Sequence, residues 1–168
     1  MPFVAQAIWT GQFRRAALLV FVAGWTDALD GFLARRFAWT SRTGAYLDPI
    51  ADKLLLISAY VALAMQGAAP VWLMWLVLGR DALILGMVAI AFAFTTVRSF
   101  PPSLWGKLST IAQVFTALAL IVLRAFVGSR QAGFEAFIIY ATAAITALSG
   151  LHYIVTGARR FQAARRAD

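Results

Sequence analysis

Four aspartates within a stretch of 26 residues are the side chains whose spacing could do chemistry. Asp27 and Asp30 lie three residues apart, and Asp48 and Asp52 lie four apart; together they are four of the seven acidic residues in the chain. At 3.6 residues per helical turn, each pair projects from one face of a helix. Two helices joined by a short loop are antiparallel neighbours, so the two pairs can face each other.

Four carboxylates that converge in a low dielectric repel each other and resist ionisation unless cations neutralise them. Oxygen ligands with no His or Cys nearby favour a hard ion, so the pattern predicts a site for Mg²⁺ or Mn²⁺. These ions commonly bind phosphate groups as well. Two such ions about 4 Å apart can stabilise both the attacking and the leaving oxygen at a phosphorus centre. The residue types therefore predict a phosphoryl-type transfer.

Small and basic residues between the two pairs fit a phosphate ligand. Gly31, Ala34 and Gly44 have little or no side chain, which allows a backbone or a ligand to approach closely. Arg35 lies one turn beyond Gly31, where a guanidinium can bind a phosphate oxygen. A single intramembrane aspartate can serve packing by pairing with an arginine, but two pairs at helical spacing favour a functional site.

The sequence around these residues is typical of a membrane protein. Of its 168 residues, 62% are hydrophobic and 13% are charged, whereas a soluble domain has about 25% charged residues. A helix needs about 20 apolar residues to cross a bilayer. The sequence predicts an all-α, polytopic membrane helix bundle, a single domain over residues 1–168, with five full transmembrane helices and a short N-terminal one. The predicted spans are Ala16–Ala38, Tyr46–Met65, Pro70–Val97, Leu104–Val127 and Gly133–Gly157, after the short segment Pro2–Phe13.

The basic residues lie in short clusters between apolar runs, which is typical of membrane orientation and contact with anionic lipid. We therefore expect no nucleic-acid partner, despite the net charge of +8. Nine basic residues fall on one set of loops and ends and four on the other, so the first set, with the acidic motif, is predicted to face the cytoplasm. The first set is Arg35, Arg36, Arg42, Arg98, Lys107, Arg159, Arg160, Arg165 and Arg166; the second is Arg14, Arg15, Arg124 and Arg130.

Four further charged residues lie within or beside apolar segments. Arg80 and Asp81 are adjacent inside one of them, and because adjacent residues on a helix do not face each other, each is predicted to have a partner on another helix. The cost of burying either charge alone favours a structural ion pair over a substrate contact. Arg98 and Lys107 fall at the predicted cytoplasmic side, where they are candidates for acceptor binding or for orientation anchors.

The acidic segment resembles the signature of the CDP-alcohol phosphatidyltransferase family without a mismatch. It reads Asp27-x-x-Asp30-Gly31-x-x-Ala34-Arg35, eight further residues, and Gly44-x-x-x-Asp48-x-x-x-Asp52. The resemblance implies a six-helix integral membrane enzyme, usually a homodimer. We expect the protein in a bacterial inner membrane. Members of the family displace CMP from a CDP-linked lipid such as CDP-diacylglycerol with an alcohol, and they use two divalent metal ions.

The resemblance also implies roles for single residues. Asp27, Asp30 and Asp48 correspond to metal ligands, and Asp52 corresponds to both a ligand and the general base that deprotonates the acceptor hydroxyl. The nucleotide and the leaving group follow from the resemblance alone. The implied nucleotide and diphosphate site comprises Asp27, Gly31, Ala34, Arg35 and Gly44.

The acceptor alcohol is less clearly indicated. "LDPIADKLLL" and "GKLSTIAQ" (Gly106–Gln113) resemble the glycerol-acceptor branch, which includes phosphatidylglycerophosphate synthases and cardiolipin synthases. The former often have a second Lys where this chain has Ser109, and Arg-Glu where it has Arg80-Asp81. The missing cation favours phosphatidylglycerol as the acceptor, as in a cardiolipin synthase. The alternative is a phosphatidylglycerophosphate synthase that uses glycerol 3-phosphate.

The start of the sequence departs from the family pattern, because Met1-Pro2 falls partway through the expected first helix. Either this helix is truncated or it is short. Two other classes stay as distant alternatives. Membrane prenyltransferases also bind diphosphates through metals on paired aspartate motifs, but their motifs contain Asn. A divalent-cation transporter would not need Arg35 beside the acids, because a fixed cation repels the permeant ion.

Overall fold

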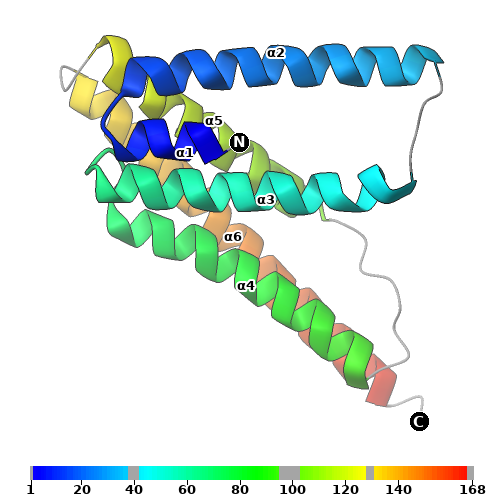
Figure 1. The fold of residues 1–168 in the computed structure, drawn as a ribbon. Coiled ribbons are helices and arrows are strands. Elements are labelled where there is room, and N and C mark those ends of the chain that lie inside the picture. The colour runs from blue at the N-terminus through cyan, green and yellow to red at the C-terminus, as the bar shows by residue number, and fades with distance from the viewer. Residues whose placement is uncertain (1, 38–41, 95–102, 128–130, 166–168) are drawn as a thin grey trace. The chain divides into compact units, whose positions relative to one another are not determined.

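The computed structural model is helical throughout the part of the chain that it describes, residues 2–37, 42–94, 103–127 and 131–165 (Figure 1). Side chains are described for these residues except 2, 27–28, 30–37, 42–52, 88, 91–94 and 160–165. The helices are α1 (Pro2–Trp9), α2 (Phe13–Phe37), α3 (Arg42–Met65), α4 (Val71–Phe94), α5 (Leu104–Phe126) and α6 (Ala132–Arg165).

These helices correspond one by one to the predicted segments, so the all-α prediction is confirmed over the described residues. α1 has only 8 residues, as expected of the short first segment, and the other helices have 23 to 34. Within the described residues, α5 and the Ala132–Arg159 part of α6 are long and apolar enough to cross a bilayer. The crossing of five helices stays a prediction.

Two glycines end helices in the same way. Gly11 follows α1 and Gly67 follows α3, and both have a positive φ, 71° and 65°. At each end the glycine N–H and the following N–H donate back to carbonyls of the last helical turn, as in Gln12 N to Ala7 O at 2.8 Å and Ala68 N to Leu63 O at 2.9 Å. This is the Schellman arrangement, in which a left-handed residue satisfies carbonyls that the helix leaves open. The glycines therefore fix where α1 and α3 stop.

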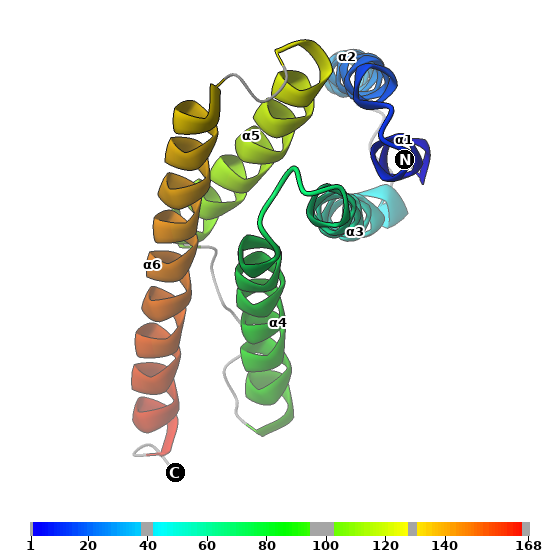
Figure 2. The same ribbon diagram turned by 90° about the vertical axis from the view of Figure 1, so that its left-hand side faces the viewer.

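The chain forms two compact units, the first comprising residues 1–71 and 117–132. In this unit α1 packs against both α2 and α3 (Figure 2). Its buried face contains Val4, Ala7 and Ile8, at the i, i+3, i+4 spacing of one helix stripe. Tyr60 and Leu63 of α3 are fully buried in the same unit. Short as it is, α1 contributes to the core of the unit that carries all four predicted carboxylates.

Two arginines join helix ends in the first unit. Arg14 Nε, at the start of α2, donates to Ala125 O near the end of α5 at 3.2 Å. Arg124 Nη2 donates to Gly67 O, just after α3, at 3.4 Å. The start of α2 and the ends of α3 and α5 therefore lie at one end of this unit. That is the grouping of Arg14 and Arg124 that the sequence predicted, opposite to the acidic motif.

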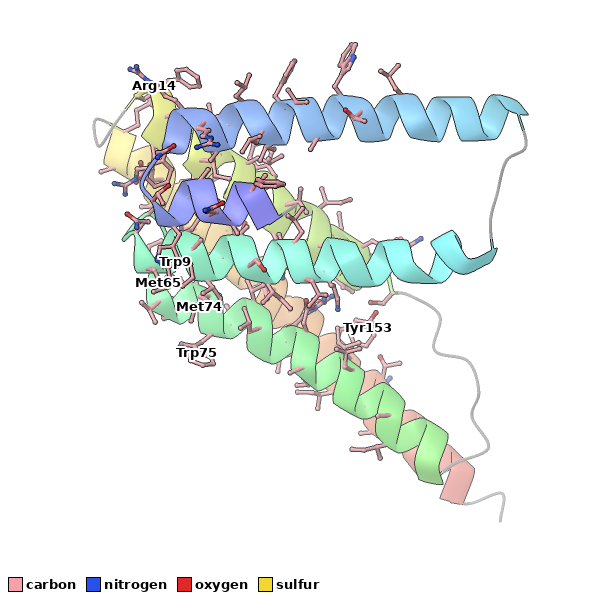
Figure 3. All side chains as sticks on the ribbon, viewed as in Figure 1. Trp9, Arg14, Met65, Met74, Trp75 and Tyr153 are labelled. Carbon is pink, nitrogen blue, oxygen red and sulfur yellow. The ribbon has the colours of Figure 1, made fainter. Side chains whose placement is uncertain are left out.

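The second unit comprises residues 72–116 and 133–168, and polar side chains fill much of its interior. Its outer surface is apolar: Ile111 and Phe115 of α5 and Phe137 of α6 are 65%, 58% and 68% exposed. In bilayers, helices often associate through polar contacts and leave apolar side chains facing lipid. Exposed apolar side chains also extend from α2 in the first unit, as Figure 3 shows. The buried polar residues of the second unit are Arg80, Asp81, Ser109, Gln113, Thr116, Glu135, Thr142, Thr146 and Ser149.

Candidate functional site

The predicted carboxylates lie on the two helices on either side of residues 38–41. Asp27 and Asp30 belong to α2, and Asp48 and Asp52 belong to α3. The two helices run antiparallel and continue beyond α1 toward their connection (Figures 1 and 2).

Their positions along the helices match. Asp27 lies ten residues before the end of α2 at Phe37, and Asp52 lies ten residues after the start of α3 at Arg42. Asp30 and Asp48 lie seven and six residues from the same ends. At 1.5 Å per residue, Asp27 and Asp52 are each about 15 Å from the connection, and Asp30 and Asp48 are each about 10 Å from it. The four aspartates thus lie at matching levels along two antiparallel helices, with α1 packed against both helices nearer their other ends.

The side chains of the four aspartates and of Gly31, Ala34, Arg35 and Gly44 lie outside the described residues, so their convergence stays a prediction. Among the side chains that are described, no group of three or more His, Cys, Asp or Glu could hold a metal ion. The donor chemistry of the predicted set fits Mg²⁺ or Mn²⁺, because it consists of carboxylate oxygens alone. The chain has no cysteine, and its histidine, His152, is on α6.

Of the two candidate acceptor-binding residues, the structure describes the side chain of one. Arg98 lies outside the described residues. Lys107 lies in the first turn of α5, in the second unit, and its side chain is exposed. Its backbone N–H donates to Ser103 O at 3.1 Å, the bond that starts the helix. An exposed ammonium on a fixed first turn can bind a phosphate, so Lys107 stays a candidate.

The prediction for Arg80 and Asp81 was wrong in one respect. Arg80 Nη1 pairs with Asp81 Oδ1 at 2.7 Å, so the two adjacent residues contact each other. The long arginine side chain spans the angle between neighbouring helix positions, which the spacing argument neglected. Arg80 also has the partners on other helices that were predicted, Ser149 Oγ of α6 at 3.0 Å and Gly106 O of α5 at 3.3 Å.

Sequence reasoning missed a row of polar contacts between α5 and α6. Gln113 Nε2 donates to both Ser109 Oγ and Thr146 Oγ1, at 3.1 and 3.2 Å. Thr116 Oγ1 and Thr142 Oγ1 are 2.6 Å apart. The signal was present: polar residues at 109, 113 and 116 follow the i, i+4, i+7 spacing of one face of an apolar helix.

The profile of one protein family, described as CDP-alcohol phosphatidyltransferase, matches residues 1–150 of the 168. This match covers both helices of the acidic motif, all of α5, and α6 as far as residue 150. The chain belongs to the CDP-alcohol phosphatidyltransferase family.

The names of relatives within this family differ. A "Probable cardiolipin synthase (CMP-forming)" of Drosophila melanogaster is 42% identical over 107 residues, 63% of this chain and 32% of that protein. A "Probable phosphatidylglycerophosphate synthase" of Mycobacterium tuberculosis is 36% identical over 135 residues, 80% of this chain and 61% of that protein. A "CDP-diacylglycerol--glycerol-3-phosphate 3-phosphatidyltransferase" of Bacillus subtilis is 31% identical over 106 residues, 63% of this chain and 54% of that protein.

The matched segments thus span 32% to 61% of these relatives' lengths. Cardiolipin synthase and phosphatidylglycerophosphate synthase are the two names of the glycerol-acceptor branch that the sequence indicated, so the family resemblance is confirmed. Because relatives of similar identity bear both names, the acceptor has to be argued from the residues of this chain.

Proposed function

We propose that this phosphatidyltransferase transfers a phosphatidyl group from CDP-diacylglycerol to a glycerol-type alcohol in phospholipid biosynthesis. The acceptor oxygen forms a bond to the phosphorus of the phosphatidyl group, and the bond from that phosphorus to the oxygen of CMP breaks. The observation that carries the proposal is the family signature at residues 27–52, set at matching levels on the antiparallel helices α2 and α3.

The residues of the signature have different proposed roles. Asp27, Asp30, Asp48 and Asp52 would hold two Mg²⁺ or Mn²⁺ ions, which supply positive charge to the diphosphate and to the departing CMP oxygen. Asp52 also accepts the proton of the acceptor hydroxyl as the new bond forms. Asp27, Gly31, Ala34, Arg35 and Gly44 bind the nucleotide and the diphosphate, with Arg35 donating to phosphate oxygens.

Phosphatidylglycerol is the acceptor that we favour, which would make the chain a cardiolipin synthase. Ser109, the position where phosphatidylglycerophosphate synthases often have a second Lys, is fully buried and bonded to Thr146 Oγ1 at 3.3 Å. It offers no cation to the doubly charged phosphate of glycerol 3-phosphate. The names of the Mycobacterium tuberculosis and Bacillus subtilis relatives keep glycerol 3-phosphate as the alternative. Arg98 and Lys107 are the proposed acceptor-binding residues.

The setting of the reaction is a membrane. The apolar surfaces of α2, α5 and α6 support a protein embedded in lipid. We propose one domain over residues 1–168 with five membrane-crossing helices, acting as a homodimer in a bacterial inner membrane. The excess of Lys and Arg beside the acidic motif supports an active site facing the cytoplasm.

The test uses the purified chain in mixed micelles with CDP-diacylglycerol and Mg²⁺ or Mn²⁺. CMP and lipid products are followed with phosphatidylglycerol, glycerol 3-phosphate, inositol phosphate and serine as acceptors. We expect metal-dependent CMP release with phosphatidylglycerol and formation of cardiolipin. Phosphatidylglycerophosphate from glycerol 3-phosphate would instead support the alternative.

Two other outcomes would contradict the proposed reaction. Consumption of a lipid diphosphate without CMP would indicate prenyl-type chemistry, and metal flux without turnover would indicate a transporter. The four acceptors are compared at equal CDP-diacylglycerol, so that a low rate with one of them reflects the acceptor.

A further inference from the structure

Arg80 is buried in the second unit and contacts residues of α4, α5 and α6. Its guanidinium pairs with Asp81 on its own helix, and its Nη2 donates to Gly106 O at the start of α5. Nε and Nη2 both approach Ser149 Oγ of α6, at 3.4 and 3.0 Å. The side chain is 6% exposed. An arginine can make these bonds at once because its donors diverge from a rigid plane, which an ammonium cannot reproduce.

The same group of residues fixes the first turn of α5. Ser103 precedes the helix, and its Oγ accepts from Gly106 N at 3.0 Å, an N-cap bond. The Ser103 N–H donates to Tyr153 Oη of α6 at 3.2 Å. The guanidinium carbon of Arg80 lies 5.8 Å from the centre of the Tyr153 ring, within cation–π range. Figure 3 labels Tyr153 on its helix.

Gly106 allows this close approach. A Cβ at position 106 would lie 2.7 Å from Tyr153 Oη and 3.3 Å from Ser103 Oγ, so a larger residue would displace the tyrosine or the cap. The glycine carbonyl accepts from Arg80, while the next residue is Lys107, whose side chain is exposed. Arg80 and Tyr153, which contact each other, therefore both hold the first turn of α5.

We propose that Arg80 is a positioning residue for acceptor binding: it holds the first turn of α5 so that Lys107 is presented to the phosphate of the acceptor in one orientation. This inference rests on the proposed function, in which Lys107 binds the acceptor. Stability alone does not account for the arrangement, because apolar residues of similar volume often stabilise a fold as much as a buried ion pair does. One bond of the guanidinium, from Nη2 to Gly106 O, reaches the turn that carries Lys107, while the bonds to Asp81 and Ser149 hold the guanidinium in place.

The kinetic test compares Arg80→Lys with Thr116→Val. Arg80→Lys keeps the charge but loses the simultaneous bonds to Gly106 O and Ser149 Oγ. We expect the KM for the acceptor to rise about tenfold, the effect of losing a bond to a charged group, with kcat and the KM for CDP-diacylglycerol little changed. Thr116→Val removes a buried α5–α6 hydrogen bond elsewhere in the same interface and should leave all three parameters unchanged.

A second readout measures the helix directly. The chain has no cysteine, so spin labels can be attached at Leu104→Cys, 77% exposed at the start of α5, and Phe137→Cys, 68% exposed on α6. Position 137 is 16 residues from Tyr153, about 24 Å along the helix, which suits electron–electron distance measurement. We expect one narrow distance in the parent, a broad distribution with Arg80→Lys, and a narrow one with Thr116→Val.

Each outcome of these two measurements either supports or overturns the inference. A broadened distance with a raised acceptor KM supports the inference. An unchanged distance overturns it, as does a broadened distance with an unchanged KM, or an equal KM increase in Thr116→Val. If Arg80→Lys does not fold, Ser149→Ala removes part of the contact and should raise the acceptor KM about threefold. If the parent releases no CMP with any acceptor, the proposed function fails, while the distances still report whether Arg80 holds the turn.

Discussion

The two regions that place charge among apolar helices do so in opposite ways. In the 27–52 region, none of the four aspartates has a Lys or Arg three or four residues away, so each is next to another carboxylate or to neutral residues at helical spacing. In the second unit, the charge of Asp81 is matched by Arg80 at 2.7 Å, and further donors of that guanidinium are bonded.

Under the proposed function, the first region binds metal ions, whereas the second contains an ion pair that holds helices together. Converging carboxylates become favourable when a cation neutralises them, whereas a matched ion pair needs no ligand. Removing a charge should therefore have opposite consequences for stability in the two regions.

The largest effect is expected on the rate, in the acidic region. Asp52→Asn removes the proposed base and one metal ligand, and we expect the rate of CMP release to fall about a thousandfold. The matched control is Glu135→Gln, which neutralises a carboxylate of α6 outside the signature and should change the rate less than about threefold. Equal losses in the two variants would refute a special role for the acidic region.

The next effect is on stability, in the second unit. Asp81→Asn leaves the buried guanidinium of Arg80 without its counter-charge, and loss of one partner of a buried pair costs about 3–5 kcal/mol. We expect a lower free energy of unfolding, measured as a lower Tm in detergent. A Tm equal to that of the parent would show that the pair contributes nothing, and the contrast between the regions would disappear.

The third prediction concerns metal removal. Mg²⁺ or Mn²⁺ at about 100 times its Kd should stabilise the parent by about 2.7 kcal/mol and raise its Tm, and a chelator should reverse this. Asp27→Asn and Asp48→Asn should abolish the rise. Without metal, both variants should be as stable as the parent or more so, because a repulsive charge is gone. A fall in their metal-free Tm, like that of Asp81→Asn, would contradict the comparison.

The smallest effect tests the polar contacts between α5 and α6. Thr116→Val removes the bond to Thr142, and such a bond inside a membrane protein contributes about 0.6 kcal/mol. We expect a small drop in Tm and an unchanged rate. Thr110→Val is the comparison, since that hydroxyl bonds within its own helix, to Gly106 O at 3.1 Å, and its loss should alter the Tm less.

The positions of the helices were predictable because apolar length is a local property of the sequence. Each predicted segment contains one helix, and the glycines after α1 and α3 mark two of the ends. The contact between Arg80 and Asp81 was mispredicted because helix spacing alone does not account for the reach of an arginine side chain. The buried row at 109, 113 and 116 was visible as a spacing, but which helix it faced depended on packing.

By itself the sequence determined the family, through four carboxylates, small residues and an arginine at the spacing of the family signature, and it predicted a phosphate and metal site there. It could do so because residue types and helical periodicity are properties of short segments. Only the tertiary structure decided that Arg80 and Tyr153 form hydrogen bonds to the first turn of α5 and the residue before it. It also decided that Ser109 is buried rather than available to a substrate. Those facts join residues 26 to 69 positions apart, and such contacts depend on how helices pack.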